Sequence, residues 1–444
     1  MKKNIIYFSV LLVSVITGAE CFSQITLPNV ITTTFVCTNT NVYLIDGKVY
    51  VKDGGKIEIQ EGTVIKGVRK ATPDQSSALI ITRSGTIDCQ GTNVNPVVFT
   101  SNEASPSIGD WGGIVLLGSA PLNRADTTIE GIDLPSLPAG VDVGYGGGGQ
   151  GLGDTLNSKG VIRYTRIEYA GAKVTADNEL NGLTCGGCGR GTELDFIQVL
   201  YGQDDAFEWF GGNVNAKHLI ALAPDDDSWD SDFGFNGNLQ FVVSVLSRTK
   251  ALYSADPNGI ESDNNQNGTT LAPRTNMRVS NMTTIGLADS LVASEFLPAP
   301  GSKRILNGAR FRRASSLTVR NSIFMGFPVG VRFESAATQA DVGRFTNNIV
   351  HGFRQVSRDA TIDASNTGYL GNVLNANAQV RLTDPFNPTL PDFRPDALSA
   401  AISGANFTGM TGLTATGSEF FQTVTYRGAF SPTTNWAATW ARFF

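Results

Sequence analysis

The apolar residues of this chain stand in short runs, with polar residues and glycines between them. The runs at 49–51 (Val-Tyr-Val), 57–59 (Ile-Glu-Ile) and 97–99 (Val-Val-Phe) are typical. Gly, Asn and Asp interrupt the runs, and the three-to-four-residue spacing of an amphipathic helix is nearly absent. Short runs bounded by turn residues predict β-strands. The chain is therefore expected to be all-β, as a sandwich, a propeller or a solenoid.

A four-residue pattern recurs through the middle of the chain: Asn or Asp, a small residue, an apolar residue and a polar residue. It occurs, with Val in place of the first Asn in the last copy, at 181–184, 205–208, 227–230, 258–261, 307–310 and 329–332. The starts of these segments are 24, 22, 31, 49 and 22 residues apart. We interpret the step of 31 as one coil with a loop, and the step of 49 as one coil with an insertion or as two coils.

A second series of asparagines supports the repeat. Each member stands five residues before a glycine: Asn281, Asn321 and Asn347. An Asn that recurs once per coil can hydrogen-bond to its copies above and below. It also tolerates the left-handed backbone bend between two short strands.

A period of 22 to 24 residues with several short strands is typical of a single-stranded right-handed parallel β-helix, a solenoid, here of roughly ten to twelve coils. A propeller would require blades of about 40 residues. Because open solenoid ends expose strand edges, we expect caps at both ends. The predicted organisation is a signal peptide at 1–23, an N-terminal cap at 24–42, the β-helix at 43–364 and a C-terminal capping segment at 365–444.

The N-terminus predicts export across an inner membrane. Lys2 and Lys3 precede an apolar stretch at 5–16, which is typical of a secretory signal. Cys21 could be lipidated only if the signal were a lipoprotein signal, which has a small residue before the cysteine. Glu20 stands at that position and disfavours lipidation, and the question stays open. The compartment also stays open between periplasm, outer surface and secretion. No membrane-spanning segment is expected in the mature chain.

The charge of the chain bears on the class of partner, and its cysteines bear on disulfide formation. The 34 basic and 40 acidic residues argue against nucleic acid. An exported chain can oxidise its thiols, so disulfides and buried free thiols both remain open, and the sequence does not give a pairing. The four cysteines of the mature chain are Cys37, Cys89, Cys185 and Cys188.

Several segments resemble exported β-helix proteins of Gram-negative bacteria, a group with pectate-lyase-like architecture. They are Asp-Trp-Gly-Gly-Ile at 110–114, Ile-Glu-Tyr-Ala-Gly at 167–171, Asp-Asp-Ala-Phe-Glu-Trp-Phe-Gly-Gly at 204–212, Asn-Ala-Lys-His at 215–218 and Tyr-Arg-Gly-Ala-Phe at 426–430. The resemblance implies the β-helix fold over most of the mature chain. The group is largely without assigned activity, so it implies no catalytic residues.

Carboxylates concentrate between residues 204 and 263. The repeat places Asp204 beside Asp226, and Asp205 beside Asp227. Carboxylates about 5 Å apart raise one another's pKa unless a cation compensates, and Ca²⁺ binds six to eight oxygens. One interpretation is a Ca²⁺ site; the other is a charge ladder on a solvated face, which Arg310 continues. The metal candidates are Asp204, Asp205, Asp226, Asp227 and Asp230.

A catalytic interpretation uses the same region. Two stacked carboxylates about 5 Å apart have the separation of a retaining glycosidase pair, and a lyase would combine Ca²⁺ with an Arg or Lys base. The catalytic candidates are Asp205, Glu208, Asp230 and Arg310, and nothing in the sequence marks one of them as the base.

Two tryptophans are candidates for stacking on sugar rings, Trp111 and Trp209, whereas Trp229 occupies an apolar position of the repeat and is expected in the core. The leading hypothesis is a non-enzymatic glycan-binding or structural surface protein with a Ca²⁺ site. Its partner would be a polysaccharide or a cell-surface glycan. The alternative is a polysaccharide lyase or a glycoside hydrolase.

Overall fold

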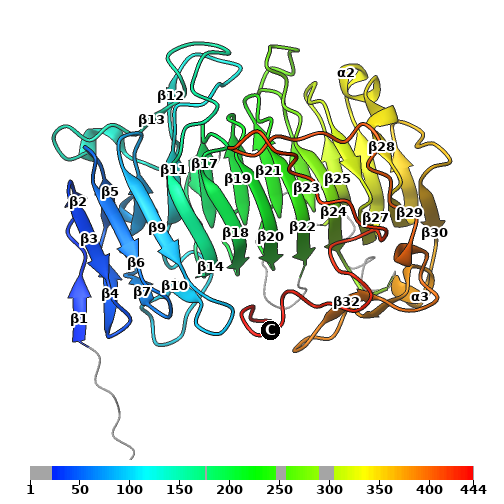
Figure 1. The fold of residues 1–444 in the computed structure, drawn as a ribbon, viewed down its shortest axis with the longest axis horizontal. Coiled ribbons are helices and arrows are strands. Elements are labelled where there is room, and N and C mark those ends of the chain that lie inside the picture. Colours follow the sequence, from blue (N-terminus) through cyan, green and yellow to red (C-terminus); the bar gives the residue numbers. More distant parts are fainter. Residues whose placement is uncertain (1–22, 176–177, 247–256, 290–304, 444) are drawn as a thin grey trace, which may run out of the picture.

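The computed structural model describes residues 23–175, 178–246, 257–289 and 305–443. Twenty-six strands form one continuous sheet, and the strand pairs within it are parallel. Parallel neighbours joined by crossover connections of the favoured hand make a right-handed β-helix. Its strands stand side by side along the long axis of the molecule (Figure 1). The all-β solenoid prediction is confirmed.

The β-helix has three faces. The strands of the first face pair in this order: β1 (Ser23–Thr26), β4 (Asn41–Ile45), β7 (Val64–Gly67), β10 (Val97–Ser101), β14 (Gly160–Glu168), β18 (Glu193–Leu200), β20 (Asn215–Leu222), β22 (Asn238–Val245), β24 (Arg278–Ile285), β27 (Ile323–Phe333), β29 (Ile349–Arg358) and β30 (Thr367–Leu370). Each of these twelve strands marks one level, or coil, of the β-helix in the described part of the chain. Twelve levels agree with the predicted ten to twelve coils.

The second face carries the candidate site. Its strands are β2 (Val30–Ile31), β5 (Lys48–Val51), β8 (Ala78–Ile81), β11 (Gly113–Leu117), β17 (Leu183–Gly186), β19 (Phe207–Phe210), β21 (Trp229–Asp232), β23 (Ile260–Ser262) and β25 (Asn307–Phe311), followed by the second halves of β27 and β29. The third face consists of β3 (Thr34–Cys37), β6 (Lys56–Ile59), β9 (Thr86–Gln90), the first halves of β14, β18, β20, β22 and β24, and then β26 (Thr318–Arg320) and β28 (Phe345–Thr346).

The remaining elements lie outside the large sheet. The antiparallel pairs are β12 (Thr127–Thr128) with β13 (Gly144–Tyr145), β15 (Ala172–Thr175) with β16 (Asn178–Leu180), and β31 (Leu382–Asp384) with β32 (Asp392–Pro395). The short helices are α2 (Ala336–Gln339) and α3 (Asn377–Val380), with single 3₁₀ turns at Pro73–Gln75, Leu134–Ser136, Val342–Arg344 and Ala400–Ile402.

The tetrapeptide repeat has the predicted register. Asp230 pairs with Glu261, and Glu261 pairs with Arg310. The steps of 31 and 49 residues are therefore each one coil with an insertion. The apolar position of the repeat points inward, where Trp229 stacks on Phe207 with ring centroids 5.0 Å apart. Trp229 belongs to the core, as expected.

The second series marks a corner of the β-helix. Asn281, Asn321 and Asn347 have left-handed backbone angles, with φ of 55°, 55° and 60°, which confirms the predicted bend. Their amides do not form the predicted bonds to one another. Asn281 Nδ2 donates instead to Tyr426 O, and Asn321 Nδ2 donates to Asn406 O.

The ends of the β-helix differ from the predicted caps. Strands β1 to β3 already pair with β4 to β6, so 24–42 is the first coil. At the other end β30 pairs with β29, which carries the sheet to Leu370. Residues 404–443, here called the C-terminal segment, run back along the β-helix (Figure 1), where Arg166 Nη1 donates to Trp440 O.

The four cysteines of the mature chain are buried free thiols. The predicted signal peptide, with Cys21, lies outside the described residues.

Candidate functional site

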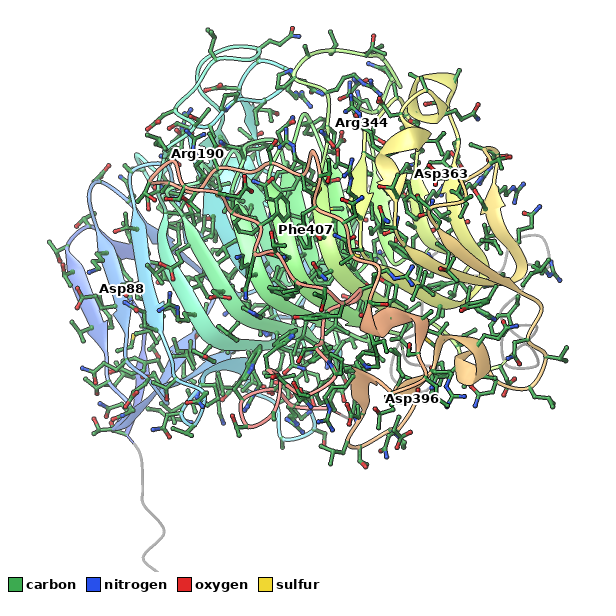
Figure 2. All side chains as sticks on the ribbon, turned by 45° about the vertical axis from the view of Figure 1, so that its right-hand side comes forward. Asp88, Arg190, Arg344, Asp363, Asp396 and Phe407 are labelled. Atoms are coloured by element: carbon green, nitrogen blue, oxygen red, sulfur yellow. The ribbon has the colours of Figure 1, made fainter. Side chains whose placement is uncertain are left out.

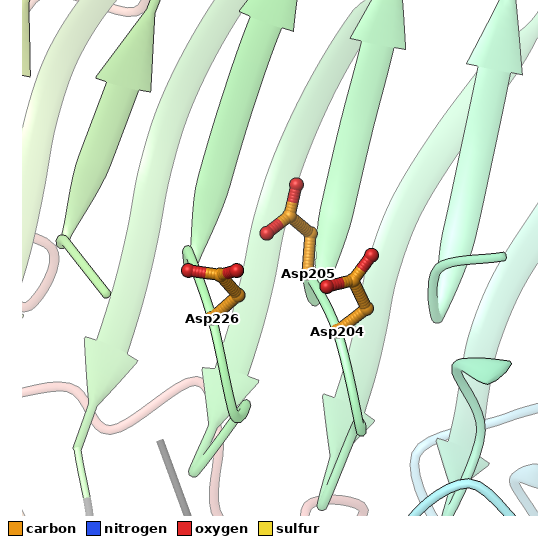
Figure 3. A group of neighbouring side chains, drawn as sticks. All are labelled: Asp204, Asp205 and Asp226. Carbon is orange, nitrogen blue, oxygen red and sulfur yellow. The ribbon is translucent and has the colours of Figure 1, made fainter. Parts of the chain in front are cut away.

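The candidate site lies where the second face begins at β19 and β21. Asp204 and Asp205 form the turn before β19, and Asp226 occupies the matching turn one level on (Figure 3). One carboxylate oxygen from each of the three residues lies within 4.8 Å of the other two. We call these three residues the first triad. The period of the sequence predicted that Asp204 lies beside Asp226, but it placed Asp205 beside Asp227 and not with these two.

A second triad shares Asp205 with the first. Its other members are Glu208 and Asp230, again with one oxygen each within 4.8 Å of the others. Asp230 Oδ1 is buried and has no hydrogen-bond partner among the described residues, and the same is true of Thr184 Oγ1. Thr184 and Asp230 flank Glu208 in the sheet register. Unsatisfied oxygens therefore stand on both sides of a buried carboxylate.

Asp227 has another role. Asp227 N donates to Asp205 Oδ1 at 2.8 Å, and Asp227 Oδ1 accepts from Asn258 N. Asn307 Nδ2 continues this column by donating to Asn258 Oδ1 at 2.7 Å. Of the five predicted metal ligands, Asp227 belongs to neither triad, because its carboxylate joins successive coils.

Burial makes these carboxylates hard to ionise. Asp204, Asp205 and Glu208 are each 7% exposed. Burial raises the pKa of Asp204 to about 8; Lys173 opposes the shift and Asp226 adds to it. Burial also raises the pKa of Asp205 and of Glu208, and neighbouring carboxylates add to both shifts. A bound cation would favour the ionised forms instead.

Lys173 is the cation closest to the first triad in the described structure. It comes from β15, and its Nζ lies 2.5 Å from Asp204 Oδ1 and 3.5 Å from Asp226 Oδ2. Burial lowers the pKa of Lys173, but Asp204, Asp226 and Glu179 together outweigh this effect and raise it. The ammonium of Lys173 thus pairs with two of the three carboxylates of the first triad.

The arginines neutralise a different part of the column. Arg312 Nε lies 2.8 Å from Asp263 Oδ1, and Arg312 also contacts Glu261. Arg310, a catalytic candidate, pairs with Glu334 at 2.9 Å and with Glu261 at 3.7 Å. Arg310 is thus two levels from Asp230 and engaged with other carboxylates. The column changes from acidic to basic at Arg310, as the charge-ladder interpretation expected, but its acidic members Glu208, Glu261 and Asp263 are buried and do not form a solvated face.

Sequence reasoning missed Glu130 and Lys173. Burial raises the pKa of Glu130 to about 9, with contributions from Glu179 and Asp204. Glu130 lies between β12 and β13, in the insertion between β11 and β14, and Lys173 lies in the β15–β16 pair. Both belong to insertions outside the coil period, so no signal in the repeat could place them at the site.

The predicted stacking role of Trp111 and Trp209 is wrong. Trp111 is fully buried, donates from Nε1 to Glu168 O and stacks on Phe99. Trp209 is 1% exposed and stacks on Trp229 inside the coil. Neither indole has a face free for a sugar ring.

Comparison with known proteins assigns the chain to a family. Residues 29–384 match the family model described as pectate-lyase-like beta helix domain, so the chain belongs to that family. A solved structure of pectate lyase Pel9A aligns with 86% of this chain and 88% of its own, at 12% identity and a TM-score of 0.35. No curated protein matches the sequence. Among the described residues, no helix is long and apolar enough to cross a membrane.

Proposed function

We propose that this chain is an exported β-helix protein of the periplasm or outer surface, which binds a glycan without cleaving it and holds Ca²⁺ at its acidic cluster. The observation that carries the cation is the convergence of Asp204, Asp205 and Asp226 within 4.8 Å. Ca²⁺ prefers carboxylate oxygens, six to eight of them. Three carboxylates supply up to six.

The second triad supports the same proposal. Asp230 Oδ1 lacks a hydrogen bond in the described structure, and an unsatisfied buried carboxylate oxygen costs free energy. A cation bound by Asp205, Glu208 and Asp230 would satisfy it. Lys173 alone cannot neutralise both triads, because its ammonium contacts Asp204 and Asp226.

The family supports a glycan as the partner. Its description as pectate-lyase-like favours a polysaccharide over protein or nucleic acid. The long parallel faces of the β-helix offer a rigid, repetitive surface for such a chain polymer.

Thermal unfolding of residues 24–444 with Ca²⁺ and with EDTA tests the cation. A ligand that binds only the folded state stabilises it by about 2.7 kcal/mol at a hundred times its Kd. We expect a higher Tm in Ca²⁺ for the wild type and no rise for Asp205→Asn, which alters both triads. Asp227→Asn is the matched control and should keep the rise. A wild type with the same Tm in both buffers would refute the Ca²⁺ site.

One observation favours the enzymatic alternative. Asp205, Glu208 and Asp230 have oxygens within 4.8 Å of one another, close to the carboxylate separation of about 5–5.5 Å in retaining glycosidases. A raised pKa would keep one of them protonated as a general acid. Release of new chain ends from acidic polysaccharides, lost in Glu208→Gln, would establish a lyase or hydrolase and overturn the non-enzymatic proposal.

A further inference from the structure

A groove with a volume of about 460 Å³ lies at the far ends of the second-face strands from the acidic cluster. The acidic turns precede β19 and β21, whereas this groove is built from the turns that follow them. One wall of the groove is formed by residues 411–413 of the C-terminal segment. The polar and charged side chains that line it include Arg190, Asn213, Asn236, Asn238 and Arg278.

The groove spans four levels of the β-helix. Its side chains stand at the starts of β18, β20, β22 and β24, which are consecutive neighbours in the sheet. Arg190 precedes β18, and Arg278 is the first residue of β24. Three steps at the interstrand spacing separate these two levels by about 14 Å. The groove therefore suits an extended ligand lying along the axis.

Three side chains of the groove wall carry buried polar atoms that form no hydrogen bond in the described structure. Arg190 Nε, Asn213 Oδ1 and Asn238 Oδ1 are buried and have no partner among the described residues. Asn238 is 4% exposed, and its Nδ2 donates to Asn215 Oδ1 at 2.6 Å, which fixes its amide. One donor and two acceptors thus lie unsatisfied in the wall of the groove, beneath its surface, where a small shift of the wall would present them to a ligand.

The groove is also positively charged. Its charged lining side chains are Arg190 and Arg278. Arg278 is held by a bond from Nη1 to Asn236 O at 2.8 Å. Arg190, at the edge of the C-terminal segment (Figure 2), forms no ion pair with any residue that the structure describes. A planar guanidinium without a carboxylate partner favours a bidentate oxyanion.

We propose that this groove binds an acidic oligosaccharide. Arg190 and Arg278 would each take a carboxylate of the sugar chain, and Asn213 and Asn238 would accept hydrogen bonds from its hydroxyl groups. Pro121, Pro273 and Leu413 supply apolar wall for the ring faces. The inference rests on the proposed glycan-binding function for the class of ligand, but it needs no cation.

Calorimetric titration in EDTA tests the groove with two probes of the same linkage. These are a β-1,4-linked tetramer of glucuronate and cellotetraose, which lacks the carboxylates. We expect the wild type to bind the glucuronate tetramer and to bind cellotetraose at least tenfold more weakly. Arg190→Ala should weaken binding of the acidic tetramer about tenfold or more. Arg69→Ala removes an exposed guanidinium far along the chain and should change nothing.

The variants separate this inference from the Ca²⁺ proposal. Asp205→Asn should bind the acidic tetramer as the wild type does, although its Tm no longer rises in Ca²⁺. If Arg190→Ala unfolds, Asn213→Ala replaces it, with a smaller expected loss. Equal affinity of wild type and Arg190→Ala, equal affinity for the two tetramers, or no binding of the acidic tetramer would each overturn the proposal.

Discussion

At the scale of single residues, Asp205 has two functions that conflict electrostatically. Its Oδ1 accepts the backbone N–H of Asp227, a bond that an asparagine amide could also make, as Asn181 Oδ1 does for Asp205 N. Its charge adds to a buried cluster that already contains Glu208 and Asp230. A structural role alone would favour Asn here, and the proposed cation site accounts for the carboxylate.

The raised pKa values predict how metal-free stability changes with pH. Burial raises the pKa of Asp204 to about 8, that of Asp232 to about 7 and that of Glu130 to about 9. The folded state therefore holds protons that the unfolded state has released. Above a pH of about 4, each such carboxyl lowers the stability by up to about 1.4 kcal/mol per pH unit, until its folded pKa is passed.

We therefore expect the urea midpoint in EDTA to fall between pH 5 and pH 8. Asp204→Asn should reduce the fall, because it removes one of these protons. Ca²⁺ should reduce it in the wild type by favouring the ionised carboxylates. A midpoint in EDTA that rises across this range would contradict the assignment of raised pKa values.

The part of the site that could be predicted is the part that repeats. The period placed Glu208 beside Asp230 and Asp230 beside Glu261, because strand register in a solenoid follows directly from coil length. Glu130 and Lys173 come from insertions, whose length carries no register. The burial of Trp111 was also out of reach, since it depends on which residue stands beside it one level away.

At the scale of elements, that neighbour is Gly67 at the end of β7. A Cβ on Gly67 would lie 2.4 Å from both Cβ and Cγ of Trp111, so the glycine provides the space for the indole. We expect Gly67→Ala to lower the free energy of unfolding by about 1–3 kcal/mol, as overpacking does. Gly343→Ala, where a Cβ would meet nothing within 4 Å, is the control. Denaturant unfolding measures both, and equal midpoints would refute the role of Gly67.

The C-terminal segment is held to the corner between the third and first faces by ring packing and by hydrogen bonds of side-chain amides. Trp440 is fully buried, with its ring 5.9 Å from Tyr164 and 6.1 Å from Phe196. Gln240 donates to Gln422 O and accepts from Gln422 N. The C-terminal segment follows this corner of the β-helix because the corner residues of successive coils present rings and amides in a row.

Truncation of Trp440 tests this attachment. We expect Trp440→Ala to cost about 3–5 kcal/mol, the usual range for a buried tryptophan. Leu374→Ala, at a side chain 83% exposed, should change stability by less than about 0.5 kcal/mol. Thermal unfolding of the two variants makes the comparison. A Trp440→Ala variant as stable as Leu374→Ala would show that the segment is only loosely attached.

At the scale of the whole molecule, a solenoid is nearly one-dimensional, because each level contacts only its neighbours. Interior levels such as β20 have a strand on both sides, whereas β1 and β30 pair on one side within the described structure. Local opening should therefore begin at the ends. The fold class followed from the period, but the pairing of residues 24–42 as a first coil did not, because a first coil has no preceding copy of the repeat to mark it.

Hydrogen exchange measures this gradient directly. We expect amides of β1 and β30 to exchange faster than those of β18, β20 and β22. The end strands need only local fraying to exchange, whereas the interior strands need an opening with a free energy close to that of global unfolding. Ca²⁺ should slow exchange in the turns at 203–206 and 225–228, where the first triad lies, and leave β1 unchanged. Because the levels couple only to their neighbours, the protection should decay over the adjacent coils. Uniform exchange along the β-helix would instead mean that the chain opens as one cooperative unit and that its two sites are energetically linked.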